Sequence, residues 1–108
     1  MSEINIKIKD ILDANNIVLF MKGTPESPQC GFSSQVVQIL NYLGIEFSSI
    51  NVLEDEEIRN GIKEYTNWPT IPQLYIKSEF IGGADIVREM FEENELKEFL
   101  EEKGIVTN

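Results

Sequence analysis

Residues 17–43 read IVLFMKGTPESPQCGFSSQVVQILNYL, and this segment contains three structural elements in a row. The continuous apolar run Ile17–Met21 is typical of a strand that is buried on both faces. The prolines and the glycine of residues 22–29 predict a loop. From Gly31 onward the apolar residues recur at helical spacing and form one stripe. A buried strand, a loop and a helix therefore follow one another, and Cys30 lies where the loop meets the helix.

The flanking segments predict the rest of one α/β domain. A helix with isoleucines at helical spacing precedes the strand, and Ser2 is a candidate N-terminal cap. The chain after residue 43 predicts a strand near residues 47–52, a helix that begins with the acids of residues 54–57, a hairpin over residues 73–81 and helices over residues 85–91 and 95–102. No repeat or linker interrupts the sequence, so we expect a single domain over residues 1–108 with helices on both faces of a four-stranded mixed sheet.

The charge balance excludes several classes of function. Nine Lys and Arg residues oppose nineteen Asp and Glu residues, which gives a net charge of −10. Binding to nucleic acid or to anionic membranes needs a positive surface, so neither is expected. No apolar run approaches the roughly 18 residues of a membrane span, and the N-terminus lacks the apolar core of a signal peptide. We therefore expect a cytoplasmic protein. The seven glutamates of residues 89–102 are interpreted as a solvated helix face, and the alternative is an acidic docking patch.

Two residue counts restrict the chemistry. The chain has no histidine, which excludes Ser-His-Asp and Cys-His catalysis and HExxH zinc sites. Cys30 is the only cysteine, so one chain forms neither an internal disulfide nor a CxxC metal site. A lone cysteine is often a small buried apolar residue. The start of a helix favours a thiolate instead, because its N–H groups and dipole stabilise negative charge, and Lys22 at the end of the preceding strand supplies a cation.

Four motifs in the chain resemble those of a known family. They are MKGTP at residues 21–25, CGFS at 30–33, WPTIPQL at 68–74 and GGADI at 82–86. In this order and spacing they resemble the monothiol glutaredoxins with a CGFS active site, over essentially the whole chain. The resemblance implies a thioredoxin fold in a single glutaredoxin domain, glutathione as ligand, and a [2Fe–2S] cluster shared between the two subunits of a homodimer. It also implies a BolA-like partner and apo iron–sulfur proteins as recipients of the cluster.

The same resemblance assigns residues to one half of glutathione. It gives the glycine carboxylate to Lys22 and Arg59, with Lys63 as a neighbour one helical turn further on, and a guanidinium suits a carboxylate because it binds in a bidentate way. The alternative for Arg59 is an ion pair within its own helix. The resemblance also implies a cis peptide bond between Ile71 and Pro72, which turns the backbone of Ile71 toward the cysteinyl unit like an added strand. The alternative there is a purely structural turn.

The γ-glutamyl half is assigned to the last motif. The glycines let the backbone approach closely, and the N–H groups at Gly83 and Ala84 begin a helix that suits the γ-glutamyl carboxylate. Asp85 is assigned to the ammonium group, and its alternative role is to cap the helix. Many members of the family carry a second cysteine where this chain has Ala84. An internal disulfide with Cys30 is therefore not available here.

Ser33 stands where dithiol glutaredoxins keep a second cysteine, so the two-cysteine route of disulfide reduction is closed. Iron–sulfur clusters prefer four thiolate ligands, and this chain supplies Cys30 alone. Two subunits and two glutathiones complete the set, which favours a carrier of a labile cluster that acts in iron–sulfur assembly and redox homeostasis. One alternative is a glutathione-dependent thiol transferase that acts through Cys30, and the resemblance links the long loop 23–29 to weak transferase activity. Another is a regulatory module whose apo and cluster-bound forms select different partners.

Overall fold

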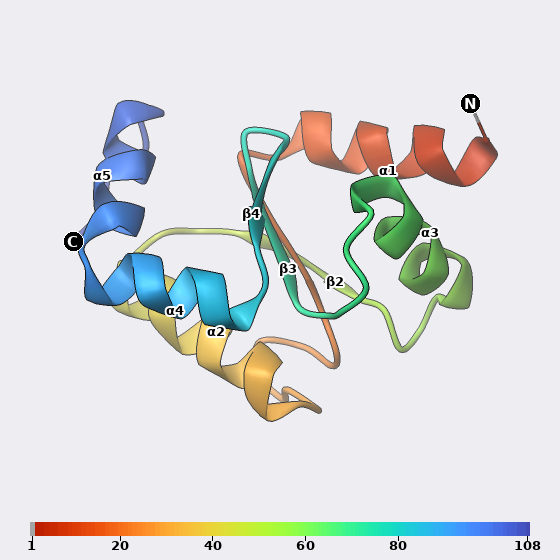
Figure 1. The fold of residues 1–108 in the computed structure, drawn as a ribbon, viewed down its shortest axis with the longest axis horizontal. Coiled ribbons are helices and arrows are strands. Elements are labelled where there is room, and N and C mark those ends of the chain that lie inside the picture. The colour runs from red at the N-terminus through yellow and green to blue at the C-terminus, as the bar shows by residue number, and fades with distance from the viewer. Residues whose placement is uncertain (1) are drawn as a thin grey trace.

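The computed structural model describes residues 2–108, which form five helices and four strands (Figure 1). In chain order these are α1 (Glu3–Ala14), β1 (Ile17–Met21), α2 (Gly31–Tyr42), β2 (Ser48–Asn51), α3 (Glu56–Thr66), β3 (Gln73–Ile76), β4 (Glu79–Gly82), α4 (Ala84–Glu92) and α5 (Glu95–Glu102). The strands lie in the order β2-β1-β3-β4. β1 runs parallel to β2 and antiparallel to β3, and β3 runs antiparallel to β4. The predicted four-stranded mixed sheet is confirmed.

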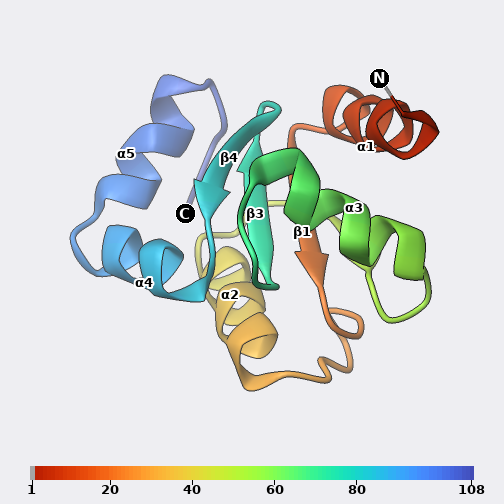
Figure 2. The same ribbon diagram turned by 45° about the vertical axis from the view of Figure 1, so that its right-hand side comes forward.

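The helices cover both faces of the sheet, as Figure 2 shows. α1 and α3 pack on one face, and α2, α4 and α5 lie on the other. β1 contributes to both cores, because Leu19 and Met21 face one and Val18 and Phe20 face the other. All five residues of β1 are buried. The apolar run that predicted a strand buried on both faces therefore holds the two layers of this thioredoxin fold together.

Side-chain caps fix two of the helix starts. The Ser2 hydroxyl accepts a hydrogen bond from the N–H of Asn5 at 3.2 Å, as the sequence predicted. Asp55 accepts one from the N–H of Ile58 at 3.1 Å and begins α3. β2 is shorter than the predicted strand and covers Ser48–Asn51, and beyond its end the Asn51 side chain accepts the N–H of Leu53 in a turn.

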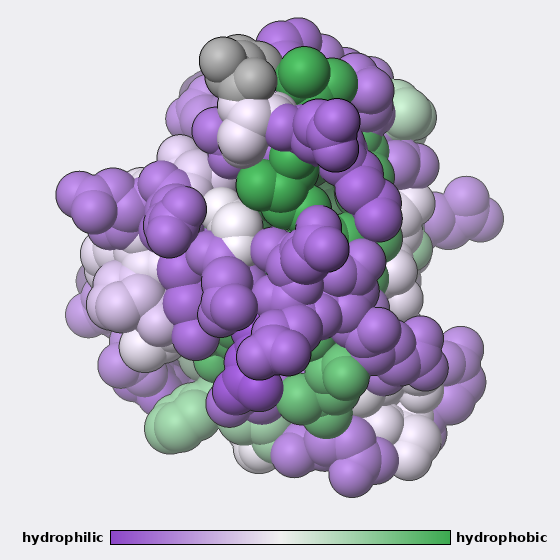
Figure 3. Space-filling view, turned by 90° about the vertical axis from the view of Figure 1, so that its right-hand side faces the viewer, coloured by the Kyte–Doolittle hydropathy of each residue, from purple (hydrophilic) through white to green (hydrophobic). Residues whose placement is uncertain are grey.

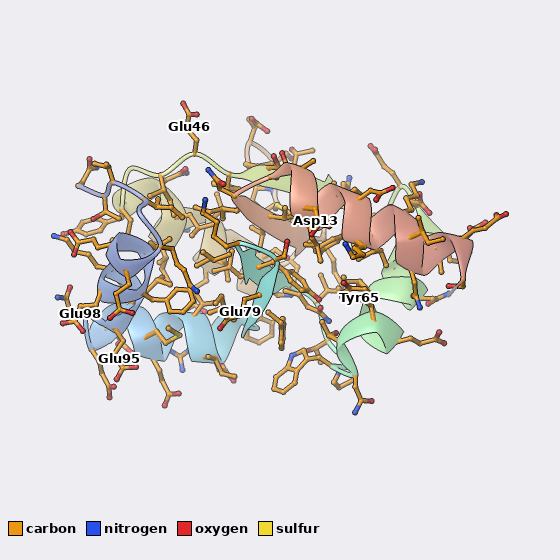
Figure 4. The ribbon with its side chains drawn as sticks, turned by 90° about the horizontal axis from the view of Figure 1, so that it is seen from above. Asp13, Glu46, Tyr65, Glu79, Glu95 and Glu98 are labelled. Carbon is orange, nitrogen blue, oxygen red and sulfur yellow. The ribbon has the colours of Figure 1, made fainter. Side chains whose placement is uncertain are left out.

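The outer surface is strongly polar. All seven glutamates of residues 89–102 are exposed, and Figure 4 shows Glu95 and Glu98 on α5 at one end of the molecule. Seen from the side of α1 and α3, the surface is mostly hydrophilic with a few hydrophobic patches (Figure 3). Within residues 2–108, no helix has the length and apolar character needed to cross a bilayer.

Candidate functional site

A cavity of about 550 Å³ opens where the end of β1, the starts of α2 and α4, and the loop before β3 meet. It brings together every residue that the sequence analysis assigned to the site except Arg59. The assigned residues that line it are Lys22, Cys30, Ile71, Pro72, Gly83, Ala84 and Asp85. These residues come from three separate parts of the chain, so the fold gathers the motifs into one place.

Cys30 is the residue immediately before α2 and is partly buried. The N–H of Ser33 lowers the pKa of the Cys30 thiol most strongly, and the N–H of Phe32 and the charge of Lys22 lower it further. Burial acts in the opposite direction and is outweighed. The thiol itself makes no capping hydrogen bond, so these N–H groups remain available to a negatively charged sulfur. The site therefore favours the thiolate form of Cys30, which argues against a purely structural role for this cysteine.

Ser33 has a structural role that the sequence analysis did not find. It is fully buried, and its Oγ accepts a hydrogen bond from the backbone N–H of Lys22 at 3.1 Å. The Ser33 hydroxyl also contributes to the lowered pKa of Cys30. Ser33 thus connects the end of β1 to the first turn of α2, besides leaving the site without a second thiol. The motif CGFS marked the position, but only the structure shows what the hydroxyl contacts.

The loop 22–29 is closed on itself rather than extended. The N–H of Gln29 donates to the carbonyl of Lys22 at 2.9 Å. Gly23 has a φ of +90°, and a Cβ added there would lie 2.6 Å from the carbonyl oxygen of Ser27. A side chain at this position would force the turn open, so glycine is required for the loop to bring Cys30 back to the end of β1.

Two lysines give the cavity its positive charge. Lys22 and Lys63 line it, and in residues 2–108 neither is within 4.0 Å of a carboxylate oxygen. Arg59 lies one turn before Lys63 on α3 and does not line the cavity. It forms no ion pair among those residues either, so the alternative of a pair within α3 is not observed. Lys63 is therefore the second cation, besides Lys22, that lines the cavity.

The start of α4 forms another wall of the cavity. Gly83 is the N-cap, and a Cβ added there would lie 3.4 Å from both the carbonyl oxygen of Pro72 and Nε1 of Trp68. The backbone of Gly83 therefore approaches this loop closely. Asp85 does not cap the helix. Its side chain is 78% exposed and lies 3.5 Å from the guanidinium of Arg88. Because Asp85 lines the cavity and is exposed, its carboxylate is accessible from the cavity.

The loop that leads into β3 carries unsatisfied polar groups. The Ile71–Pro72 peptide bond is cis, as the resemblance implied. Among residues 2–108, neither the N–H nor the carbonyl of Ile71 forms a hydrogen bond. Trp68 and Thr70 also line the cavity, and Nε1 of Trp68 is buried without a partner among the described residues. The sequence analysis assigned no role to either residue, although both lie in the motif WPTIPQL.

The fold and the site together define a class of protein: a thioredoxin-fold protein with a single reactive thiol beside a positively charged cavity. The family profile described as Glutaredoxin matches residues 17–81. A Synechocystis protein named uncharacterized monothiol glutaredoxin ycf64-like is 57% identical over 99 residues, which cover 92% of each chain. The chain therefore belongs to the glutaredoxin family, and it is a monothiol member.

Solved structures agree with this assignment. The solution structure of a monomeric truncated mutant of Trypanosoma brucei 1-C-Grx1 matches with a TM-score of 0.89 and 42% identity, over 100% of this chain and 98% of that one. The crystal structure of a buckwheat glutaredoxin–glutathione complex matches with a TM-score of 0.83 and 25% identity, over 95% of this chain and 92% of that one. The expected thioredoxin fold is confirmed.

Proposed function

We propose that this protein binds glutathione in the cavity beside Cys30. Glutathione carries two carboxylates, an ammonium group and a thiol. Lys22 and Lys63 offer cations to the glycine carboxylate, and the unpaired backbone groups of Ile71 suit the cysteinyl unit. The first N–H groups of α4 suit the γ-glutamyl carboxylate, and the exposed carboxylate of Asp85 suits the ammonium. The buckwheat complex is evidence that this fold holds the tripeptide.

We further propose that two subunits share a [2Fe–2S] cluster as cargo. The donor set is the main support, because Cys30 is the only cysteine and histidine is absent. In residues 2–108, no group of three or more His, Cys, Asp or Glu residues is arranged to hold a metal ion. Four thiolates are preferred by such clusters, so two Cys30 side chains and two bound glutathiones complete the set. Partly exposed Cys30, beside a Phe32 that is 61% exposed, is accessible to a second subunit.

The proposed ligand set explains a role in transfer. Half of the thiolates belong to glutathione and are not covalently part of the protein, so the cluster is easily released to apo iron–sulfur proteins. A BolA-like protein, which the family resemblance implies, is a further partner under this proposal. The observation that carries the proposal is the position of the only cysteine of the chain, with its lowered pKa, at a cavity that suits glutathione.

Anaerobic reconstitution tests the proposal. Protein incubated with iron, sulfide and glutathione is expected to become coloured and dimeric, as measured by visible absorption and by size, while the apo protein stays mainly monomeric. Cys30→Ser, and replacement of glutathione by an analogue without a thiol, are each expected to abolish the colour. Ser34→Ala is the matched control, because it lies in the same turn of α2 outside the cavity lining. A stable cluster in monomeric protein without glutathione would contradict the proposal.

A second function is favoured by the lowered pKa of Cys30. The Cys30 thiolate attacks the glutathione sulfur of a glutathionylated protein, the protein thiolate leaves, and Cys30 is glutathionylated. The thiolate of a second glutathione then attacks this adduct, which releases oxidised glutathione and the Cys30 thiolate. Deglutathionylation of a model protein that is lost in Cys30→Ser would support this activity, and an equal rate in that variant would exclude it.

A further inference from the structure

Gln73, the first residue of β3, is fully buried beneath the cavity loop. Its Nε2 donates to the carbonyl of Trp68 at 3.0 Å and to the carbonyl of Thr70 at 3.2 Å. Its Oε1 accepts from the Tyr75 hydroxyl at 3.1 Å and lies 3.1 Å from the Thr66 hydroxyl. A carboxamide has two N–H groups, so both donors of Gln73 are used by the loop, and its oxygen accepts from Tyr75.

The two sides of this amide face different parts of the molecule. Nε2 faces the loop of residues 68–72, which lines the cavity. Oε1 faces the core, where Tyr75 packs edge-on against Phe20 with ring centroids 5.5 Å apart. The cavity loop is therefore connected through one side chain to the buried centre of the sheet.

Gln73 decides which backbone groups of the loop remain available. It uses the carbonyls on both sides of Pro69, at Trp68 and Thr70. The next residue is Ile71, whose N–H and carbonyl make no hydrogen bond among residues 2–108. With two neighbouring carbonyls held inward, the unpaired groups of Ile71 remain for a ligand in the cavity.

We propose that Gln73 is a positioning residue for glutathione, which holds the loop of residues 68–72 so that the backbone of Ile71 is presented to the tripeptide. Gln73 does not itself line the cavity. Its effect is exerted through the loop, because a buried carbonyl that loses its donor turns toward another partner or toward water. This inference rests on the proposal that glutathione binds beside Cys30.

Glutathione titration of reduced apo protein tests the proposal, with fluorescence of Trp68, the only tryptophan, as the signal. Gln73→Met keeps the length of the side chain and removes both donors to the loop. Tyr75→Phe is the matched control, because it removes a hydrogen bond on the core side of the same amide. The titrations are made at a temperature at which urea unfolding curves show that all three proteins are folded. Relative to the wild type, we expect a Kd for glutathione that is about tenfold higher for Gln73→Met and that differs by less than about twofold for Tyr75→Phe.

Equal affinity in folded Gln73→Met and wild type would overturn the proposal, as would an equal loss in both variants, which would indicate a general effect of stability. If Gln73→Met does not fold, Gln73→Leu also lacks the donors to the loop, and the same tenfold loss is expected. If neither variant folds, the Nε2 proton resonances of Gln73 in the wild type decide. They are expected to shift at saturating glutathione, and unshifted resonances would overturn the proposal. Wild-type protein that fails to bind glutathione would instead contradict the proposed function.

Discussion

Lys63→Gln is expected to weaken glutathione binding although the protein carries a net charge of −10. Lys63 lines the cavity, is half-buried, and lies within 4.0 Å of no carboxylate oxygen in residues 2–108. The glycine carboxylate therefore meets an ammonium group without a competing partner. Glutamine is one atom shorter than lysine and keeps a hydrogen-bond donor, so the substitution removes mainly the charge.

The size of the effect follows from partial burial. Two unit charges 4 Å apart attract by about 4 kcal/mol at the effective dielectric constant of about 20 near a protein surface. Solvent screening and the ordering of a long side chain reduce this gain for a half-exposed lysine. A net loss of about 1–2 kcal/mol is expected, which corresponds to a Kd roughly 5- to 30-fold higher. The effect should shrink as salt is raised, because exposed charges are screened.

Arg59→Gln is the matched comparison, because Arg59 lies on the same helix one turn away and outside the cavity lining. The family resemblance predicts a loss of affinity for this variant, whereas the lining predicts a loss of less than about threefold. Isothermal titration calorimetry with reduced glutathione at low and high salt measures all three proteins. Unchanged affinity and salt dependence in Lys63→Gln would refute the reasoning from the cavity. A larger loss in Arg59→Gln would assign the carboxylate to the guanidinium.

Four further results are expected. The alkylation rate of Cys30 against pH should give a thiol pKa below the free value of about 8.5, and Ser33→Ala should raise it. Because the pKa of Cys30 is lower in the folded protein than in the unfolded one, the thiolate stabilises the fold above the unfolded pKa, and this contribution should disappear as the pH falls through the folded pKa. Urea unfolding of the wild type and of Cys30→Ser at several pH values measures the contribution. A difference between the two proteins that does not change with pH would contradict this prediction. Oxidised glutathione should convert the protein mainly to a Cys30 glutathione adduct in intact mass spectrometry, because no second cysteine is present, and a free thiol on most molecules would argue against the cavity as a glutathione site. Gly82→Ala should lower the free energy of unfolding by about 1–3 kcal/mol, because the new Cβ would lie 2.8 Å from Cβ of Ile86. Gly31→Ala is the control and should change the free energy of unfolding little, because its new Cβ meets no atom within 4 Å. Similar values for both variants would show that the contact at Gly82 is relieved without cost.

The order of the elements could be predicted because each one has a local signal. The apolar run Ile17–Met21 indicated a strand buried on both faces, and its residues do contribute to the two cores. Ser2 was predicted as a cap and accepts the expected hydrogen bond. The extent of β2 was predicted less well. Its end depends on the side chain of Asn51, whose hydrogen bonds involve the distant Gly23 as well as Leu53.

The site was predictable to the extent that motifs carry it. The apolar stripe of residues 31–43 predicts a helix directly after Cys30, so the position of Cys30 at a helix start could be predicted from the sequence. The resemblance named most of the other residues that line the cavity. Ser33 and Gln73 differ, because the role of a buried polar side chain depends on which backbone groups lie beside it. Those groups belong to Lys22 and to the loop of residues 68–72.

The sequence by itself determined the type of site, a single thiol at a helix start with no histidine and no second cysteine, because residue identity and local spacing suffice for that conclusion. Only the tertiary structure decided which cation of α3 lines the cavity. Arg59 and Lys63 are four residues apart and share one face of the helix, about 6 Å apart along its axis. Periodicity cannot distinguish them, because the distance of each turn from Cys30 depends on where α3 lies across the sheet, and that position is set by its packing against α1 and the core.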